Sequence, residues 1–251
     1  NNKNNQPYIS AVRKVEVGNG NTRIGSSAFY SYTNLTDIAI PDSVTNIDSY
    51  TFYQCHNLTS INIPDSVTNI GGYAFDSCRN LTNITIPDSV THIEGRAFQQ
   101  CINLTNVTLP DGLTSIDVNT FYSCYNLTNI TIPDSVTNIG GYAFYCCRTL
   151  TNITLPDGLT NIRYSAFQQC SNLTNITIPD SVTNIETDAF TDCYSLAKVR
   201  FNGVTPPTLA SSNTFARLPS DCIISVPVGC LEAYTTATNY PSATTYTYVE
   251  E

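Results

Sequence analysis

Seven cysteines recur at a constant spacing of 23 residues, and thiols can bind metals, form disulfides or act as nucleophiles. This cysteine row comprises Cys55, Cys78, Cys101, Cys124, Cys147, Cys170 and Cys193. In a stacked repeat its members would lie about 4.8 Å apart, within the range of disulfides. A metal site is not expected, because no Cys-x-x-Cys pair with a nearby histidine is present. The pattern favours small buried thiols that pack beside phenylalanine.

Three cysteines lie outside this row. Cys146 precedes Cys147, so we expect Cys146 to face outward and to react first with a thiol reagent. Cys222 and Cys230 are eight residues apart and flank an expected strand and turn, where they either pair or stay free. The cysteine content is compatible with secreted and with reduced proteins.

An aspartate follows a proline in seven successive repeats. These residues are Asp42, Asp65, Asp88, Asp111, Asp134, Asp157 and Asp180. Stacked carboxylates could gather Ca²⁺, but an aspartate after proline usually bonds back to the backbone of a turn. The sequence therefore favours a structural row that caps turns.

Catalysis has little support in the residue types. The two histidines, His56 and His92, are one repeat plus 13 residues apart, so they are expected on different faces. Neither has a recurring partner that would form a nucleophile and base pair, and no glycine loop suited to phosphates is present. We predict a non-enzymatic protein without cofactor or metal.

The elements that position these residues follow from the same 23-residue period. In residues 81–103, Leu81, Ile84 and Ile86 alternate with polar residues as in a strand, which Pro87 ends. A second short extended segment contains Val90 and Ile93, and a turn or short helical segment then closes the coil. That last segment carries Ala97, Phe98 and Cys101. Because one coil cannot bury this apolar face alone, the fold class is a repeat solenoid with short parallel β-strands.

Three rows of polar residues are expected on the outer face of the first strand. One of them is Thr82, Thr105, Thr128, Thr151 and Thr174, and the other two contain the candidate site. The threonine row is Thr85, Thr108, Thr131, Thr154 and Thr177; the asparagine row is Asn83, Asn106, Asn129, Asn152 and Asn175. These rows are our candidate ligand-binding residues, because hydroxyls and amides can bind protein or sugar. The alternative is a solvated sheet face stabilised by cross-strand pairs. Tyrosines such as Tyr50, Tyr73 and Tyr142 either anchor a partner or pack between coils, and packing is favoured.

The pattern LxxIxIPxxVxxIxxxAFxxC occurs seven times almost intact, and in this it resembles the BspA-like leucine-rich repeat surface proteins. Residues 223–240, IISVPVGCLEAYTTATNY, are similar to the strand, proline and short helix that cap this family. We expect a loose N-terminal segment at residues 1–11. A solenoid of eight to nine coils should follow at residues 12–202, with a C-terminal cap at residues 203–251.

Composition narrows the class of partner. The net charge is −9, with 11 basic and 20 acidic residues, so nucleic acid and anionic membrane surfaces are disfavoured. No apolar run is long enough to cross a bilayer. The family resemblance implies an adhesin of a microbe, at the cell surface or secreted, that attaches to host matrix or other cells. No leader or anchor is recognised in this chain. The alternative is a structural spacer or interaction module of a larger protein.

Overall fold

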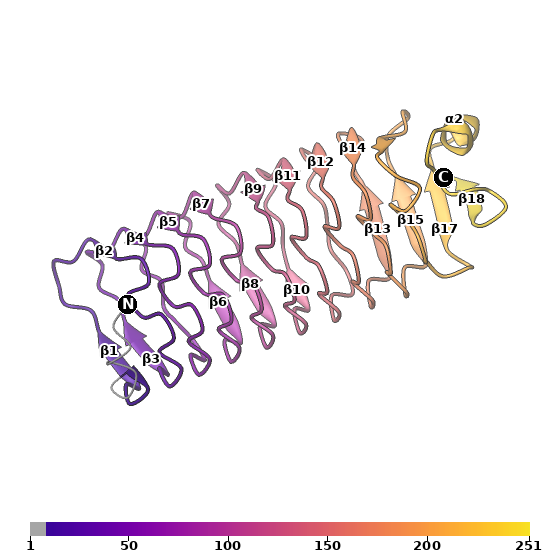
Figure 1. The fold of residues 1–251 in the computed structure, drawn as a ribbon. Helices are drawn as coiled ribbons and strands as arrows, with labels where there is room; N and C mark the ends of the chain where they lie inside the picture. Colours follow the sequence, from indigo (N-terminus) through magenta and orange to yellow (C-terminus); the bar gives the residue numbers. More distant parts are fainter. Residues whose placement is uncertain (1–8) are drawn as a thin grey trace.

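A computed structural model describes residues 9–251 as one elongated stack of coils (Figure 1). The N-terminal residues of the predicted loose segment, 1–8, lie outside the described part of the chain. The strands form two ladders, one on each side of the coil, and every strand pair is parallel. The repeat solenoid predicted from the sequence is confirmed.

The first ladder contains the strands that begin each repeat. They are β1 (Lys14–Glu16), β3 (Asp37–Ala39), β6 (Asn83–Thr85), β8 (Asn106–Thr108), β10 (Asn129–Ile130), β13 (Asn175–Ile178), β15 (Lys198–Phe201), β17 (Ile223–Val226) and β18 (Thr247–Glu250). Hydrogen bonding divides them into the sheets β1-β3, β6-β8-β10 and β13-β15-β17-β18. A single bridge joins Asn152 to Asn175. The ladder is open between β3 and β6 and again between β10 and Asn152.

The second ladder contains shorter strands. They are β2 (Arg23–Ile24), β4 (Asn46–Ile47), β5 (Asn69–Ile70), β7 (His92–Ile93), β9 (Ser115–Ile116), β11 (Asn138–Ile139), β12 (Asn161–Ile162), β14 (Asn184–Ile185) and β16 (Thr208–Leu209). They form the sheets β2-β4-β5-β7 and β9-β11-β12-β14-β16. In each strand the isoleucine or leucine points into the core and its polar neighbour points away.

Turns, rather than helical segments, close each coil. In residues 94–101, Arg96 and Gln100 have φ values of 65° and 56°, which an α-helix does not allow. The backbone N–H groups of Arg96, Phe98 and Gln100 donate to carbonyls of the next coil at 2.9, 3.0 and 2.8 Å. This third set of bonds between coils satisfies the backbone of an otherwise irregular segment.

The core is a column of phenylalanines inside these turns. Neighbouring rings from Phe29 to Phe190 are stacked with centroids 5.2–5.7 Å apart. Phe98 is fully buried, as predicted. All eight residues assigned inward in residues 81–103 are at most 3% exposed. The strand and turn periods therefore identified the core correctly.

The cysteine row lies beside this column as buried free thiols, as expected for apolar filling. Each thiol donates to a phenylalanine carbonyl of the previous coil; Cys101 Sγ is 3.1 Å from the oxygen of Phe75. Burial raises the pKa of Cys55 to about 12, so these thiols are poor nucleophiles. The expectation for Cys146 is wrong: it is only 4% exposed, and its thiol donates to Gln169 Oε1 at 2.8 Å.

Gly71 lies where two adjacent coils approach each other closely. A Cβ atom on this residue would lie 2.4 Å from the backbone nitrogen of Ser49. The backbone conformation is ordinary, so it is contact with the previous coil that requires glycine here. Gly71 is thus a point of tight stacking between coils.

The C-terminal region first continues the solenoid and then caps it. The strand β16 pairs with β14, and Phe215 stacks on Phe190 at 5.3 Å. The boundary predicted at residue 202 falls inside this coil. The strand β17, Pro227 and the helix α2 (Leu231–Thr236) follow, which confirms the expected order of the cap. Cys222 and Cys230 are both free in the structure.

Candidate functional site

The asparagine row forms an amide ladder on the exposed face of the first strands. Asn106 Nδ2 donates to Asn83 Oδ1 at 2.8 Å, and Asn129 Nδ2 donates to Asn106 Oδ1 at 3.1 Å. The second N–H of Asn106 reaches the Thr105 hydroxyl at 3.1 Å. Both donors of this amide are therefore used within the protein. The ladder stops between Asn129 and Asn152, where the strand pairing also stops.

The threonine row lies on the same face and is available to a ligand. All five side chains are exposed, and Thr85 is in register with Thr108. No hydrogen bond from these five hydroxyls to another described residue is found. Each hydroxyl can therefore donate and accept at the surface. The structure therefore places both predicted rows on one face. Hydrogen bonds within the protein already use part of the bonding capacity of the asparagine amides.

Charged side chains bound this neutral surface at both ends. Lys14 and Asp37 form an exposed ion pair of 3.5 Å at the N-terminal end. At the other end Thr177 is in register with Arg200, and Lys198 lies 2.7 Å from Glu251. The rows between them present about five coils of hydroxyls and amides without charge.

The aspartate row does not cap the turns as expected. Val67 donates its N–H to the carbonyl of Pro64, and the neighbouring serine hydroxyl bonds to the previous coil. Ser66 Oγ, for example, lies 2.6 Å from the carbonyl oxygen of Val44. Among the seven aspartates, the one side-chain bond found runs from the N–H of Asp111 to Asp88 Oδ1 at 3.4 Å. Across residues 9–251 no group of His, Cys, Asp or Glu could hold a metal ion.

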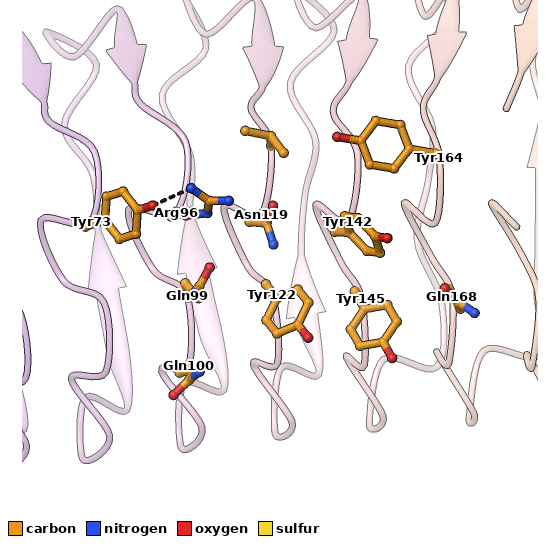
Figure 2. A pocket seen from close by; sticks show the side chains of 11 residues that line it. Tyr73, Arg96, Gln99, Gln100, Asn119, Tyr122, Tyr142, Tyr145, Tyr164 and Gln168 are labelled. Atoms are coloured by element: carbon orange, nitrogen blue, oxygen red, sulfur yellow. Dashed lines mark hydrogen bonds between the residues drawn. The ribbon is translucent and has the colours of Figure 1, made fainter. Parts of the chain in front are cut away.

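A second candidate surface is a groove over the turns that carry the phenylalanines. Figure 2 shows its side chains along the solenoid. The groove has a volume of about 700 Å³ and is named here the tyrosine groove. Its lining is Tyr73, Arg96, Gln99, Gln100, Val118, Asn119, Tyr122, Tyr142, Tyr145, Tyr164 and Gln168.

The groove exists because two columns of tyrosine are interrupted. One column places Arg96 and Asn119 between Tyr73 and Tyr142, at steps of 23 residues. Tyr73 and Tyr142, like Arg96 and Asn119, have positive φ, which directs every member of the column in the same way. The smaller amide of Asn119 leaves a hollow between aromatic walls, as seen in Figure 2.

One wall of the groove consists of tyrosines that are held by contacts among their own side chains. Tyr122 and Tyr145 stack with ring centroids 4.8 Å apart, and Tyr142 meets Tyr164 edge-on at 5.1 Å. A Cβ on Gly141 would lie 2.4 Å from the Tyr164 ring, so glycine allows that ring to lie against the backbone. Burial raises the pKa of Tyr122 and of Tyr145, so both phenols remain neutral.

The opposite wall carries the positive charge of the groove, which lies on Arg96. The Arg96 guanidinium lies 5.2 Å from the centre of the Tyr73 ring and donates Nη1–H to its hydroxyl (Figure 2). Behind this wall Asp76 is 3% exposed and bonds to the Ser77 hydroxyl at 2.7 Å. Burial raises the pKa of Asp76 to about 6, although the Ser77 bond and the Arg96 charge oppose that shift.

The two histidines lie on separate surfaces, as the spacing predicts. His56 Nδ1 lies 2.9 Å from the carbonyl oxygen of Ser77, beside the turns. His92 lies in β7 and is 3.8 Å from Asp117 Oδ2. Neither histidine lines the tyrosine groove.

Sequence reasoning treated the tyrosines as packing residues and did not find the groove. Their 23-residue spacing was visible, and so was the interruption at Arg96 and Asn119. Whether the two columns lie side by side depends on the left-handed turns, which the residue types did not reveal.

Comparison with known proteins identifies the repeat. The model of the BspA type leucine rich repeat region matches in six copies over residues 7–127 and 91–220. The chain belongs to the BspA-type leucine-rich repeat family. Leucine-rich repeat proteins are generally binding modules rather than enzymes, and within residues 9–251 no helix is long and apolar enough to span a membrane.

Solved structures of bacterial leucine-rich repeat proteins are similar to the chain. A leucine-rich repeat protein of T. pallidum is 32% identical, with a TM-score of 0.56 over 61% of this chain and 72% of that one. A leucine-rich repeat protein of Eubacterium ventriosum is 20% identical, with a TM-score of 0.54 over 95% of this chain and 74% of that one, and it shows the fold alone. Among curated proteins no match was found.

Proposed function

We propose that this chain is the binding region of a microbial adhesin, displayed at the cell surface or secreted, that attaches to protein or glycan on host or neighbouring cells. Family membership supports a binding module. The observation that carries the proposal is the exposed threonine row, whose hydroxyls have no hydrogen-bond partner among residues 9–251. A surface of repeated, unoccupied donors and acceptors suits a ligand that is itself extended.

Recognition by this surface would be spread over many weak contacts. Each neutral hydrogen bond contributes about 0.5–1.5 kcal/mol net. Useful affinity therefore needs several coils at once, or several copies of the protein on one cell. Because the rows carry no charge, binding should depend little on salt concentration.

The test is a triple substitution of Thr108, Thr131 and Thr154 by glutamate. We expect the variant to lose retention on immobilised extracellular matrix proteins and on bacterial surface extracts, because three carboxylates would occupy the recognition face. A single Thr131→Glu change should weaken retention much less. Thermal unfolding checks that the triple variant is folded.

The matched control places three glutamates at the exposed Thr91, Thr114 and Thr137, each of which directly precedes a strand of the second ladder. This control should bind as the unmodified protein does. Normal retention by a folded Thr108, Thr131 and Thr154 variant would show that the first-strand face is not the binding surface.

A further inference from the structure

The tyrosine groove has a lining that matches one class of ligand. Ten of its eleven side chains carry a hydrogen-bonding group, and Val118 is the one aliphatic residue among them. Five are tyrosines, whose rings offer apolar faces and polar edges together. Four are amides, each able to donate and accept in one plane.

A saccharide has the complementary chemistry. One face of a pyranose ring presents C–H groups that pack on an aromatic ring, while its hydroxyls lie around the edge. The half-buried rings of Tyr142 and Tyr145 and the amides of Gln99 and Asn119 line one groove, as Figure 2 shows. Ring faces and amides in such proximity can hold both parts of a sugar at once.

The positive charge in the groove narrows the class of saccharide that fits it. Arg96 is the one charged residue in the lining, and no carboxylate of residues 9–251 lies within ion-pair distance of it. The nearby Glu94 accepts from the Gly72 N–H at 2.7 Å, and Asp76 accepts from Ser77. The guanidinium has five donors and uses one on Tyr73, so others remain for an anionic oxygen.

We propose that the tyrosine groove binds an oligosaccharide containing a sugar with a carboxylate, which Arg96 recognises. The rings of Tyr142 and Tyr145 pack on the sugar chain, and Gln99 and Asn119 bond its hydroxyls. This proposal rests on a different surface from the threonine row and does not depend on it.

The same surface is less suited to a proline-rich peptide, which also binds aromatic grooves. Such peptides rest on apolar ridges and need apolar sockets between them. Here the positions between the rings carry the polar side chains of Arg96, Asn119 and Gln99 instead of apolar ones. A proline-rich decapeptide therefore serves as the alternative ligand in the test.

Titration calorimetry of the whole chain would use sialyllactose and a hyaluronan tetrasaccharide as acidic probes and lactose as a neutral probe. We expect at least one acidic probe to bind, with lactose bound about tenfold more weakly or not at all. Arg96→Gln and Tyr145→Ala should each weaken the acidic probe by about tenfold or more. Because one ion pair is involved, raising the salt concentration should weaken binding.

Two substitutions serve as matched controls. Arg148 lies over the Tyr125 ring at 4.8 Å but outside the groove, and Tyr30 stacks on Tyr53 at the same 4.8 Å as Tyr145 on Tyr122. Arg148→Gln and Tyr30→Ala should leave binding unchanged, and thermal unfolding should show that all four variants are folded.

Three results would overturn the proposal. The first is no binding of either acidic probe at millimolar concentration. The second is binding that survives Arg96→Gln, or that is equal for lactose. The third is binding of the decapeptide that Tyr145→Ala abolishes, without binding of any saccharide.

Discussion

The position of an aspartate in the coil determines whether its carboxyl group is solvated or buried. The seven aspartates after proline are largely solvated, whereas Asp76 is 3% exposed beneath the Arg96 wall of the tyrosine groove. Its carboxyl has a single strong partner, the Ser77 hydroxyl. A buried carboxyl with so little compensation favours its neutral form, and this raises its pKa to about 6.

Asp76→Asn should stabilise the protein at neutral pH and have little effect in acid. The folded pKa of about 6 lies above the ordinary 3.8, so the contribution of Asp76 is fully present below about pH 4 and is lost as the pH rises through 6. At pH 7.5 the variant should gain about 2–3 kcal/mol in the free energy of unfolding. Urea unfolding at pH 4 and 7.5 measures this. The exposed Asp65→Asn is the control, and an equal response of both variants would contradict the assignment.

At the scale of the coil, stability comes from columns of identical residues rather than from individual strands. Strands of two to four residues are too short to be stable alone, and the phenylalanine column lies at the turns instead. The carbonyl of each phenylalanine from Phe29 to Phe167 also accepts a thiol of the next coil, as Phe75 accepts from Cys101. The turn segment thus links adjacent coils through rings, thiols and backbone bonds together.

Phe98→Ala should therefore destabilise far more than a change on the exposed face. The cavity should cost about 3–5 kcal/mol, because rings from both neighbouring coils bound it. Asn106→Ala should change stability by no more than about 0.5 kcal/mol, since water can replace its exposed amide bonds. Urea unfolding of the two variants checks the difference. Equal midpoints would contradict the assignment of inward and outward faces.

The whole molecule is held together by contacts between neighbouring coils. Strand partners are one repeat apart in the sequence through the regular part of the chain, as β6 and β8 are. Such a solenoid has no core that spans its length, so its stability is approximately a sum over coils and interfaces. Irregularity is concentrated at the C-terminal end, where Phe201, Tyr234 and Tyr240 cluster under the cap.

Removal of one whole repeat should leave a folded protein. Deleting residues 106–128 joins Thr105 to Asn129 and restores the 23-residue register. We expect a circular dichroism spectrum of the same shape as that of the full chain. The urea m-value should be smaller, because less surface is exposed when the shorter chain unfolds. Deleting residues 106–116 is the control, since it breaks the register and should prevent folding. Loss of structure in the 23-residue deletion would show that coupling extends beyond neighbouring coils.

The amino-acid sequence by itself determined the fold, the inward residues and the position of the polar rows. This was possible because each coil stacks on the next, so a residue such as Phe98 must meet Phe75 and Phe121, 23 positions away. The exposure of Thr108 and Asn106 followed from strand alternation. Their role in binding stays a prediction.

Only the tertiary structure showed in which direction the side chains point around the coil. Left-handed backbone at Tyr142 and Cys146 aims these side chains in a way that residue types do not reveal. It buries Cys146 near Tyr122 and Tyr145 instead of exposing it, and it aligns the tyrosine columns into a groove. The period of a sequence sets which residues are neighbours along the stack. Only the path of the backbone within one coil sets which columns lie side by side.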